Sequence, residues 1–339
     1  MNKILVTGGA GYIGSHTCVE LISSGFTPII IDNFNNSDKK IIRNINKISN
    51  SEIKVYEIDC NNKTDLQNVI KSEEDIAGVI HFAAYKAVGE SVQAPLKYYH
   101  NNVGSLVTLL EVCKENNIET IVFSSSCTVY GQPDEPCVTE STPIIKAESP
   151  YGNTKQICEE ILTDYFKSGN NIKAALLRYF NPIGAHSSGL IGELPIGIPN
   201  NLVPFITQTA DGIREKLTVF GDDYNTTDGS CIRDFIHVVD LAKAHIAALK
   251  WLQNQNKSII DTFNIGSGNG NSVLEAIESF ERTNKVKVNY SIGPRRAGDV
   301  EQIYADPEKA NKILNWKTEL DLDTSMKDAW NWQLNLKNW

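Results

Sequence analysis

Residues 3–33 read KILVTGGAGYIGSHTCVELISSGFTPIIIDN, and this stretch decides the fold. The short apolar run at residues 4–6 predicts a strand that is buried on both faces. Helical spacing of apolar side chains over residues 12–24 predicts a helix, and a second apolar strand at 29–31 ends in Asp32. The order strand, glycine turn, helix, strand and acid is typical of the first unit of a dinucleotide-binding domain.

The turn of this unit contains four glycines, Gly8, Gly9, Gly11 and Gly14. Glycine allows positive φ and a close approach of backbone to a phosphate, because it carries no Cβ. The helix that follows offers unpaired N–H groups and a partial positive charge to a pyrophosphate. Asp32, eighteen residues after Gly14, can accept hydrogen bonds from a ribose 2′-hydroxyl and repels a 2′-phosphate, so we predict NAD rather than NADP. A glycine turn without a nucleotide is the alternative, but it would weaken a helix start for no packing reason.

The composition is that of an ordinary globular chain. Of its 339 residues 41% are hydrophobic and 22% charged, and the length suits a nucleotide-binding domain plus a smaller second part. The formal net charge of −9 disfavours nucleic acid or an anionic membrane as the main partner. No apolar stretch approaches membrane-spanning length, and the N-terminus shows no signal-peptide pattern. The seven cysteines contain no C-x-x-C pair, which suits a reducing compartment, so we expect a cytoplasmic protein.

We predict no metal ion. The histidines occur singly, without metal-ligand spacing such as H-x-x-x-H, at His16, His81, His100, His186, His237 and His245. Each is better explained as a hydrogen-bonded structural residue than as a ligand.

Strand and helix patterns alternate through the first half of the chain. After a polar segment at 34–50, which we expect to be loop and a short helix, we predict strands at 55–58, 78–82, 120–123 and 173–177 and helices at 65–71, 95–116 and 150–168. The alternation predicts an α/β fold with a Rossmann-type doubly wound parallel sheet. Ligands of such sheets bind outside the carboxyl ends of the strands, where the glycine turn, Asp32, Asp59, residues 82–86 and residues 124–126 should meet.

The amino-acid composition changes after Tyr179, because residues 180–204 are rich in Gly, Pro and Asn. A connection of this length is usually functional or disordered, and its apolar residues argue against disorder. We expect a nucleotide-binding domain at 1–180 and a smaller mixed α/β substrate-binding domain at 181–339, and leave open the return of segments near 235–265 to the first domain. Further strands and helices are expected at 217–220, 232–237, 240–252, 262–265, 273–283, 286–290 and from about 323.

Tyr151 and Lys155 form a candidate catalytic pair, because residues at i and i+4 share one helix face. A nearby ammonium favours the phenolate, so Lys155 is expected to lower the pKa of Tyr151 and to make it a usable base. Pro150 marks the helix start, and the pair follows a serine-rich strand end. A surface Tyr-Lys pair is the alternative.

Ser126 is the expected third member of this group. Its hydroxyl can hydrogen-bond the reacting oxygen of a substrate and pass a proton. Ser124 and Ser125 are its rivals by sequence alone, and backbone capping is the structural explanation of such a serine turn.

Ten sequence blocks follow one another in a specific order, namely VTGGAGYIGSH, IDN, HFAAYKAVGESV, NNV, FSSSCTVYG, SPYGNTK, LRYFNPIGAH, GIPNNLVP, RDFIHVVDLA and RRAGDV. With them the chain resembles the extended short-chain dehydrogenase/reductase family and, more closely, the UDP-glucose (UDP-galactose) 4-epimerases within it. The match runs essentially from end to end.

The resemblance implies a tightly held NAD that is not consumed, and reversible 4-epimerisation of UDP-galactose and UDP-glucose through a transient 4-keto sugar. Tyr151, activated by Lys155 and assisted by Ser126, would remove the proton of the sugar 4-hydroxyl while hydride passes to NAD⁺. The implied NAD contacts are Gly8, Gly11, Tyr12, Ile13, Gly14, Asp32, Asn33, Asn36, Ser37, Asp59, Cys60, Phe82, Ala83, Lys86, Asn101, Ser124, Tyr151, Lys155, Tyr179 and Phe180.

The resemblance also implies a UDP-hexose site and a homodimer formed through helices of the nucleotide domain, here 95–116 and 150–168. The two arginines of this site suit a diphosphate, because a guanidinium fork binds it through two hydrogen bonds. A solvated surface charge is the alternative for any single arginine. The implied substrate contacts are Lys86, Ser126, Tyr151, Asn181, Asn201, Leu202, Phe220, Arg233, Arg296, Asp299 and Ile303.

Three positions bear on rival activities and on specificity. The related 4,6-dehydratases carry Asp-Glu in the places of Cys127 and Thr128, and UDP-glucuronate decarboxylases carry Glu in the place of Thr128; neither carboxylate is present. Ile303 stands where strict glucose/galactose enzymes have a large Tyr and enzymes that accept N-acetylated sugars have a small residue. We expect UDP-glucose and UDP-galactose as the main pair, with a side activity on UDP-GlcNAc and UDP-GalNAc.

Two other functions stay open at this point. A non-catalytic NAD-sensing regulator on the same fold would be expected to lack Tyr151 or Lys155, and both are present. A net oxidoreductase that releases NADH is poorly separated from an epimerase by sequence.

Overall fold

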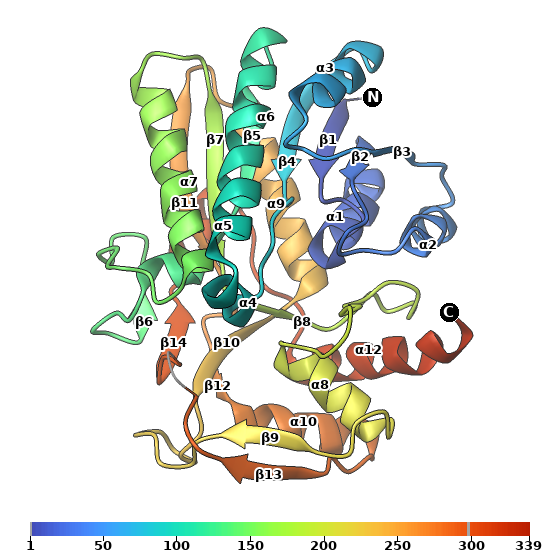
Figure 1. Ribbon diagram of the computed structural model, residues 1–339, viewed down its shortest axis with the longest axis vertical. Helices are drawn as coiled ribbons and strands as arrows, with labels where there is room; N and C mark the ends of the chain where they lie inside the picture. The colour runs from blue at the N-terminus through green and yellow to red at the C-terminus, as the bar shows by residue number, and fades with distance from the viewer. Residues whose placement is uncertain (1, 297–298) are drawn as a thin grey trace.

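A seven-stranded parallel sheet forms the larger part of the structure (Figure 1). The computed structural model describes residues 2–296 and 299–339. The strand order is β11-β7-β5-β4-β1-β2-β3, and each neighbouring pair is parallel. The order reverses at β1, so the predicted Rossmann-type doubly wound sheet is confirmed. The strands are β1 (Lys3–Thr7), β2 (Thr27–Asp32), β3 (Lys54–Glu57), β4 (Ile76–His81), β5 (Thr120–Ser126), β7 (Lys173–Tyr179) and β11 (Ile259–Ile265).

Helices cover both faces of this sheet (Figure 1). Ile4 and Val6 of β1 pack into the apolar layer of α1, α2 and α9, whereas Leu5 between them packs into the layer of α3 and α6. Side chains alternate along a strand, so a continuous apolar run such as 4–6 needs both layers. The covering helices are α1 (Tyr12–Ser23), α2 (Lys40–Ser49), α3 (Lys63–Ser72), α6 (Gly104–Glu115), α7 (Pro150–Lys167) and α9 (Val238–Gln253).

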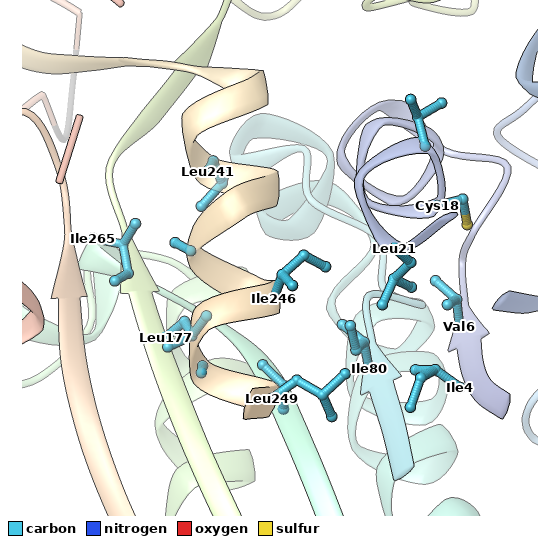
Figure 2. Packing of buried hydrophobic residues seen from close by; sticks show 14 of the residues in the cluster. Ile4, Val6, Cys18, Leu21, Ile80, Leu177, Leu241, Ile246, Leu249 and Ile265 are labelled. Atoms are coloured by element: carbon cyan, nitrogen blue, oxygen red, sulfur yellow. The ribbon is translucent and has the colours of Figure 1, made fainter. Parts of the chain in front are cut away.

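Helix α9 packs on this sheet although it follows the long loop in sequence. Figure 2 shows Leu241, Ile246 and Leu249 of α9 directed towards Leu177 of β7 and Ile80 of β4. These five side chains are at most 4% exposed. The next strand, β11, pairs with β7 over its full length. The chain therefore returns to the first unit after it has entered the second.

A second unit holds two smaller sheets and three helices. One sheet has the order β12-β10-β14-β6, with β8 paired to β10, and the other joins β13 to β9. Its strands are β6 (Cys137–Val138), β8 (Asn181–Ile183), β9 (Leu217–Phe220), β10 (Ile232–His237), β12 (Gly270–Ser272), β13 (Tyr290–Gly293) and β14 (Gln302–Ala305), and its helices are α8 (Leu202–Ala210), α10 (Val273–Asn284) and α12 (Leu322–Asn335). Short helices elsewhere are α4 (Val88–Gln93), α5 (Pro95–Tyr98), α11 (Glu308–Ile313) and 3₁₀ turns at Cys127–Tyr130 and Leu336–Asn338.

The single helix expected at 95–116 is wrong. The chain forms α5, a π-helical turn at Tyr99–Val103 and then α6. Within this turn the Asn102 side chain accepts a hydrogen bond from the Tyr85 backbone N–H at 2.8 Å and donates to the Tyr85 carbonyl at 3.0 Å. The same amide donates to the Thr154 hydroxyl on α7 at 3.2 Å. These tertiary bonds come from residues distant in sequence, so local helical spacing could not reveal the break.

The strand expected at 286–290 is also displaced. Only Tyr290 of that range belongs to β13, which pairs with β9 from Tyr290 to Gly293. Val288 is buried and packs with Phe280 in the core of the second unit, so its apolar character reflects packing rather than strand pairing.

Among the described residues, no helix has the length and apolar character needed to cross a membrane.

Candidate active site

The carboxyl ends of the central strands meet at one edge of the large sheet. Thr7, the last residue of β1, lies opposite Ile31 of β2 and His81 of β4. The next residues along the chain, Gly8, Asp32 and Phe82, therefore lie at the same level at this edge of the sheet. Ligands of doubly wound sheets bind at this edge.

The glycine turn packs tightly against its neighbours. Gly8 has φ +70°, and a Cβ there would lie 2.9 Å from the backbone nitrogen of Ala83. A Cβ on Gly14 would lie 2.3 Å from the carbonyl oxygen of Gly8. Asp32 Oδ2 accepts a hydrogen bond from the Ala10 N–H at 3.0 Å. Glycine is required at both positions, and the acid at the end of β2 fixes the turn.

The first turn of α1 is open to an anion. Gly11 is the N-cap residue, no side chain caps the helix, and its first turn contains no acid. The N–H groups of Tyr12 and Ile13 thus carry the partial positive charge of a helix start without a side-chain partner. Such a start seats a phosphate, so these residues fit the diphosphate of a dinucleotide. The Tyr12 hydroxyl donates to the Gly184 carbonyl at 2.7 Å and ties the long loop to this turn.

The residues expected around adenosine are partly brought together. Asp32 Oδ1 accepts from the Ser37 hydroxyl at 2.9 Å, and the Asn33 amide donates to Asp59 Oδ2 at 3.4 Å. Asn36 is exposed beside them. Cys60 instead packs in the core between the sheet and α3, and burial raises the pKa of its thiol to about 12.

The three expected catalytic residues lie at the same edge. Ser126 ends β5, and Tyr151 and Lys155 lie on the first turns of α7, whose N-cap Ser149 accepts a hydrogen bond from the Gly152 N–H at 3.1 Å. Ser126 and Lys155 are buried and Tyr151 is half-buried. The Ser126 hydroxyl oxygen accepts from the Thr128 hydroxyl at 3.0 Å.

The expected lowering of the Tyr151 pKa is wrong for the ligand-free structure. Burial, followed by the phenol of Tyr179, raises the pKa of Tyr151 above its usual range, and a hydrogen bond with Ser126 opposes only part of that rise. The Lys155 ammonium donates to the Ser124 carbonyl at 2.6 Å, and burial lowers the pKa of Lys155 to about 8. The phenol is therefore protonated at neutral pH.

Other side chains expected to contact NAD lie near the carboxyl ends of β4, β5 and β7 or in the π-helical turn. The hydroxyls of Ser124 and Tyr179 are hydrogen-bonded to each other, and the Phe82 ring packs on His245 with centroids 4.7 Å apart. Phe180 is buried at the end of β7. Asn101 lies in the π-helical turn, where its amide donates to Asn102 Oδ1 at 3.0 Å, and Ala83 adjoins the Gly8 turn.

The two expected arginines meet around one carboxylate. Arg296 forms a two-point ion pair with Asp299, at 2.6 and 3.1 Å, and its guanidinium lies 5.6 Å from the centre of the Phe220 ring. An Arg233 nitrogen lies 3.7 Å from Asp299 Oδ1. Four of the predicted substrate residues are thus adjacent, although three separate segments supply them.

Ile303 lies beside this cluster. It pairs with Arg233 in the register of β14 and β10, is 6% exposed, and packs with Phe180 and Val129. Half-buried Cys127, next to Ser126, packs against the same group. Ile303 therefore lies next to Arg233 and in the same apolar cluster as Cys127, the residue after Ser126.

Two more expected contacts lie at the start of α8, and a third lies at the start of β8. Asn201 is the N-cap residue of that helix, Leu202 is its first residue, and Asn181 begins β8. Lys86, in the loop after β4, forms an ion pair with Glu193 at 2.9 Å, and Glu193 also accepts a hydrogen bond from Asn201. The sequence analysis missed Glu193. Its only signal was its place in the long loop after residue 180.

No group of three or more His, Cys, Asp or Glu side chains within residues 2–296 and 299–339 is arranged to hold a metal ion.

The fold and the Ser126, Tyr151 and Lys155 group define a dinucleotide-binding protein of the short-chain dehydrogenase/reductase class. A family model described as GDP-mannose 4,6 dehydratase matches residues 5–329.

Curated relatives and solved structures narrow this class. The chain is 48% identical to the UDP-glucose 4-epimerase of Dictyostelium discoideum over 332 residues, which is 98% of this chain and 96% of that one. It is also 48% identical to the Bacillus subtilis enzyme of the same name, over 97% of this chain and 96% of that one. The chain belongs to the UDP-glucose 4-epimerase family.

Two crystal structures match nearly the whole fold. The epimerase of Stenotrophomonas maltophila, with bound NAD and formylated UDP-arabinopyranose, has a TM-score of 0.96 and 43% identity, over 100% of this chain and 99% of that one. The epimerase of Bifidobacterium longum, in complex with NAD⁺ and UDP, has a TM-score of 0.95 and 44% identity, over 99% of both chains.

Replacing Lys155 with Met tests the buried ammonium. Between about pH 8 and the usual value of 10.5, the unfolded chain keeps a proton on Lys155 that the folded chain has lost. The free energy of unfolding of the wild type therefore rises with pH relative to Lys155→Met. We expect the stability advantage of Lys155→Met to shrink by about 1–2 kcal/mol from pH 7 to pH 9.5 in urea unfolding of dinucleotide-free protein. The exposed Lys250→Met variant is the control, and a pH-independent difference for Lys155→Met would contradict the lowered pKa.

Proposed function

We propose that this protein interconverts UDP-galactose and UDP-glucose by epimerising carbon 4 of the sugar, with NAD held throughout. The observation that carries the proposal is the meeting of Ser126, Tyr151 and Lys155 at the edge that also holds the open glycine turn. Ile303 pairs with Arg233 and shares an apolar cluster with Cys127, the residue after Ser126, which brings the arginine cluster close to this group.

We assign NAD to the unit with the seven-stranded sheet and the UDP-sugar to the second unit. The Gly8 turn and the uncapped start of α1 would hold the dinucleotide diphosphate, and Asp32 would face the adenosine ribose. Asp32 also excludes a 2′-phosphate by charge. When bound, NAD supplies a hydride acceptor and donor and, in its oxidised form, a positive charge near the phenol.

Residues of the protein accept and orient the proton of the sugar 4-hydroxyl. Tyr151 takes the proton of the sugar 4-hydroxyl, and Ser126 hydrogen-bonds the same oxygen and keeps it aimed at the phenol. Lys155 is anchored on the Ser124 carbonyl beneath them and keeps a cation close to the site at neutral pH. The positive charge of bound NAD⁺ and the Lys155 ammonium would both favour the phenolate.

The second unit would bind the UDP portion. Arg233 and Arg296 offer guanidinium forks to the diphosphate, and Phe220 offers a 42% exposed ring to a flat base. Asp299 holds the two cations together before ligand arrives, so their mutual repulsion is offset.

The site favours epimerisation over dehydration. Loss of the sugar 6-hydroxyl as water needs an acid and a base near Ser126. The two residues after Ser126 are Cys127 and Thr128, and the Thr128 hydroxyl is hydrogen-bonded back to Ser126. Neither residue is a carboxylate, so these two positions supply no acid–base pair for dehydration.

We expect Tyr151→Phe to lower kcat about 10²–10⁴-fold, because general acid–base catalysis is worth that much. Purified protein is given UDP-galactose without free NAD, and UDP-glucose formation is followed. Tyr165→Phe, on the same helix, should keep full activity, since that side chain packs in the core between α6 and α7. Full activity of Tyr151→Phe would contradict the proposal. Stoichiometric release of NADH by the wild type would instead favour a net oxidoreductase.

The main substrates are the unsubstituted hexoses, and we infer a side activity on UDP-GlcNAc and UDP-GalNAc. Ile303 supports this, because it is smaller than tyrosine and lies next to Arg233 and in the same apolar cluster as Cys127. A larger ring at this place would fill space that an N-acetyl group needs.

We expect Ile303→Tyr to lower kcat/KM for UDP-GlcNAc at least tenfold while changing that for UDP-glucose less than threefold, and Ile303→Ala to shift selectivity in the opposite direction. Both sugars are measured on the same preparation. Equal selectivity in all three proteins would contradict a role for this side chain.

We further infer a homodimer formed through α6 and α7 and the segment before them, and a cytoplasmic location. The dimer is supported by Leu96, which is 81% exposed, and Val107, which is 39% exposed. The seven cysteines are free thiols, which suits a reducing compartment.

We expect the wild type to sediment as a dimer and the double variant Leu96→Glu/Val107→Glu as a monomer. Ile213→Glu, a change at another exposed apolar side chain in the second unit, should remain dimeric; an unchanged mass for the double variant would refute this interface.

A further inference from the structure

Glu193 joins the two units at the candidate site. One of its carboxylate oxygens, Oε1, accepts from the Lys86 ammonium at 2.9 Å and from the Asn201 side-chain amide at 2.6 Å. The Glu193 side chain is 11% exposed. Lys86 follows β4 of the large sheet, whereas Asn201 begins α8 of the second unit. A single oxygen therefore links a residue of the cofactor side to one of the substrate side.

The bond to Glu193 changes what Asn201 does for its own helix. An asparagine at the N-cap position usually accepts a hydrogen bond from a backbone N–H of the first turn. Here the Asn201 side chain makes no capping bond, and the first turn of α8 contains no acid. Pro204 has no N–H, so Leu202 and Val203 supply the donors at this helix start. Glu193 thus keeps these donors available to an anion.

Glu193 is fixed by its surroundings rather than swinging freely. Its backbone carbonyl accepts a hydrogen bond from the indole N–H of buried Trp332 at 2.9 Å. The start of the same loop is held by the Tyr12 hydroxyl on the Gly184 carbonyl. The carboxylate is therefore placed before any ligand binds, which lowers the entropy lost on binding.

A carboxylate near two diphosphate sites would by itself repel them. Lys86 offsets that charge, and in return Glu193 holds the long lysine side chain, which is 45% exposed, in one place. The ion pair gives the site an ordered cation without an uncompensated acid.

We propose that Glu193 is a positioning residue, which turns the Asn201 amide away from its own helix and holds Lys86, and so keeps the start of α8 ready for the diphosphate of the UDP-sugar. The inference rests on the proposed function for the identity of that ligand. It adds a residue that the resemblance did not supply.

The test compares wild type, Glu193→Ala and Glu193→Gln in the NAD-loaded protein, with UDP as the titrant in calorimetry. In Glu193→Ala the Asn201 side chain is free to cap α8, so we expect the Kd for UDP to rise about tenfold, which corresponds to one N-cap bond. KM for UDP-galactose should rise equally, and kcat should stay within about threefold. Glu193→Gln keeps an oxygen that accepts from Asn201 and should bind UDP within about threefold of the wild type.

Glu73→Ala is the matched control. Glu73 is a buried carboxylate that also pairs with lysines, Lys3 at 3.2 Å and Lys54 at 2.9 Å, but it lies after α3, near the opposite ends of β1 and β3. This variant should lose thermal stability and keep the wild-type Kd for UDP.

Three results would overturn the inference: unchanged UDP affinity in Glu193→Ala, equal weakening in Glu193→Gln, or equal weakening in Glu73→Ala. Wild-type protein that binds UDP without epimerising UDP-galactose would refute the proposed function instead. The two failures are therefore distinguishable.

Discussion

The parallel register of β1 with β2 and β4 is the constraint on which the site depends. Because Thr7 lies level with Ile31 and His81, the three following loops leave the sheet side by side. The start of α1, the Asp32 carboxylate and the Phe82 ring therefore lie at the same edge of the sheet. The hydrogen bond from the Ala10 N–H to Asp32 joins two of these loops directly, so the turn and the acid are a single rigid piece.

A buried charged pair behind this edge links α7 to the strands beneath it. Glu159, one turn beyond Lys155 on α7, binds Arg178 of β7 through two hydrogen bonds of 2.6 and 2.9 Å. Ser125 of β5 donates to the same carboxylate at 2.5 Å. Both charged side chains are at most 8% exposed, so losing either partner would leave an uncompensated buried charge. The helix that carries the phenol and the ammonium is thereby locked to the two strands beneath it.

Much of the fold and the cofactor edge could be predicted from the sequence, because both depend on local patterns. Apolar runs predict buried strands, glycines predict the turn, and Pro150 predicts the start of α7. The π-helical turn at Tyr99–Val103 could not be predicted, since it depends on Asn102 meeting Tyr85 and Thr154.

The same limit applies to charge and to distant partners. The pKa of Tyr151 was expected to fall because Lys155 is near in sequence, but burial of the phenol outweighs that proximity. Glu193 gains its meaning only when the two units meet around it. Individual residues of the second unit could be named by resemblance, whereas their mutual contacts required the three-dimensional structure.

The late return of α9 and β11 to the large sheet has a consequence for how the chain can be divided. A fragment ending at residue 180 would keep every glycine and serine of the cofactor edge, yet it would lack α9, which covers one face of the sheet together with α1 and α2, and one edge of β7 would be unpaired. Exposed strand edges of this kind pair with those of other molecules, which leads to aggregation. The ribosome must therefore synthesise the chain beyond Ile265 before the core of the first unit can be completed. The two units therefore fold together rather than one after the other.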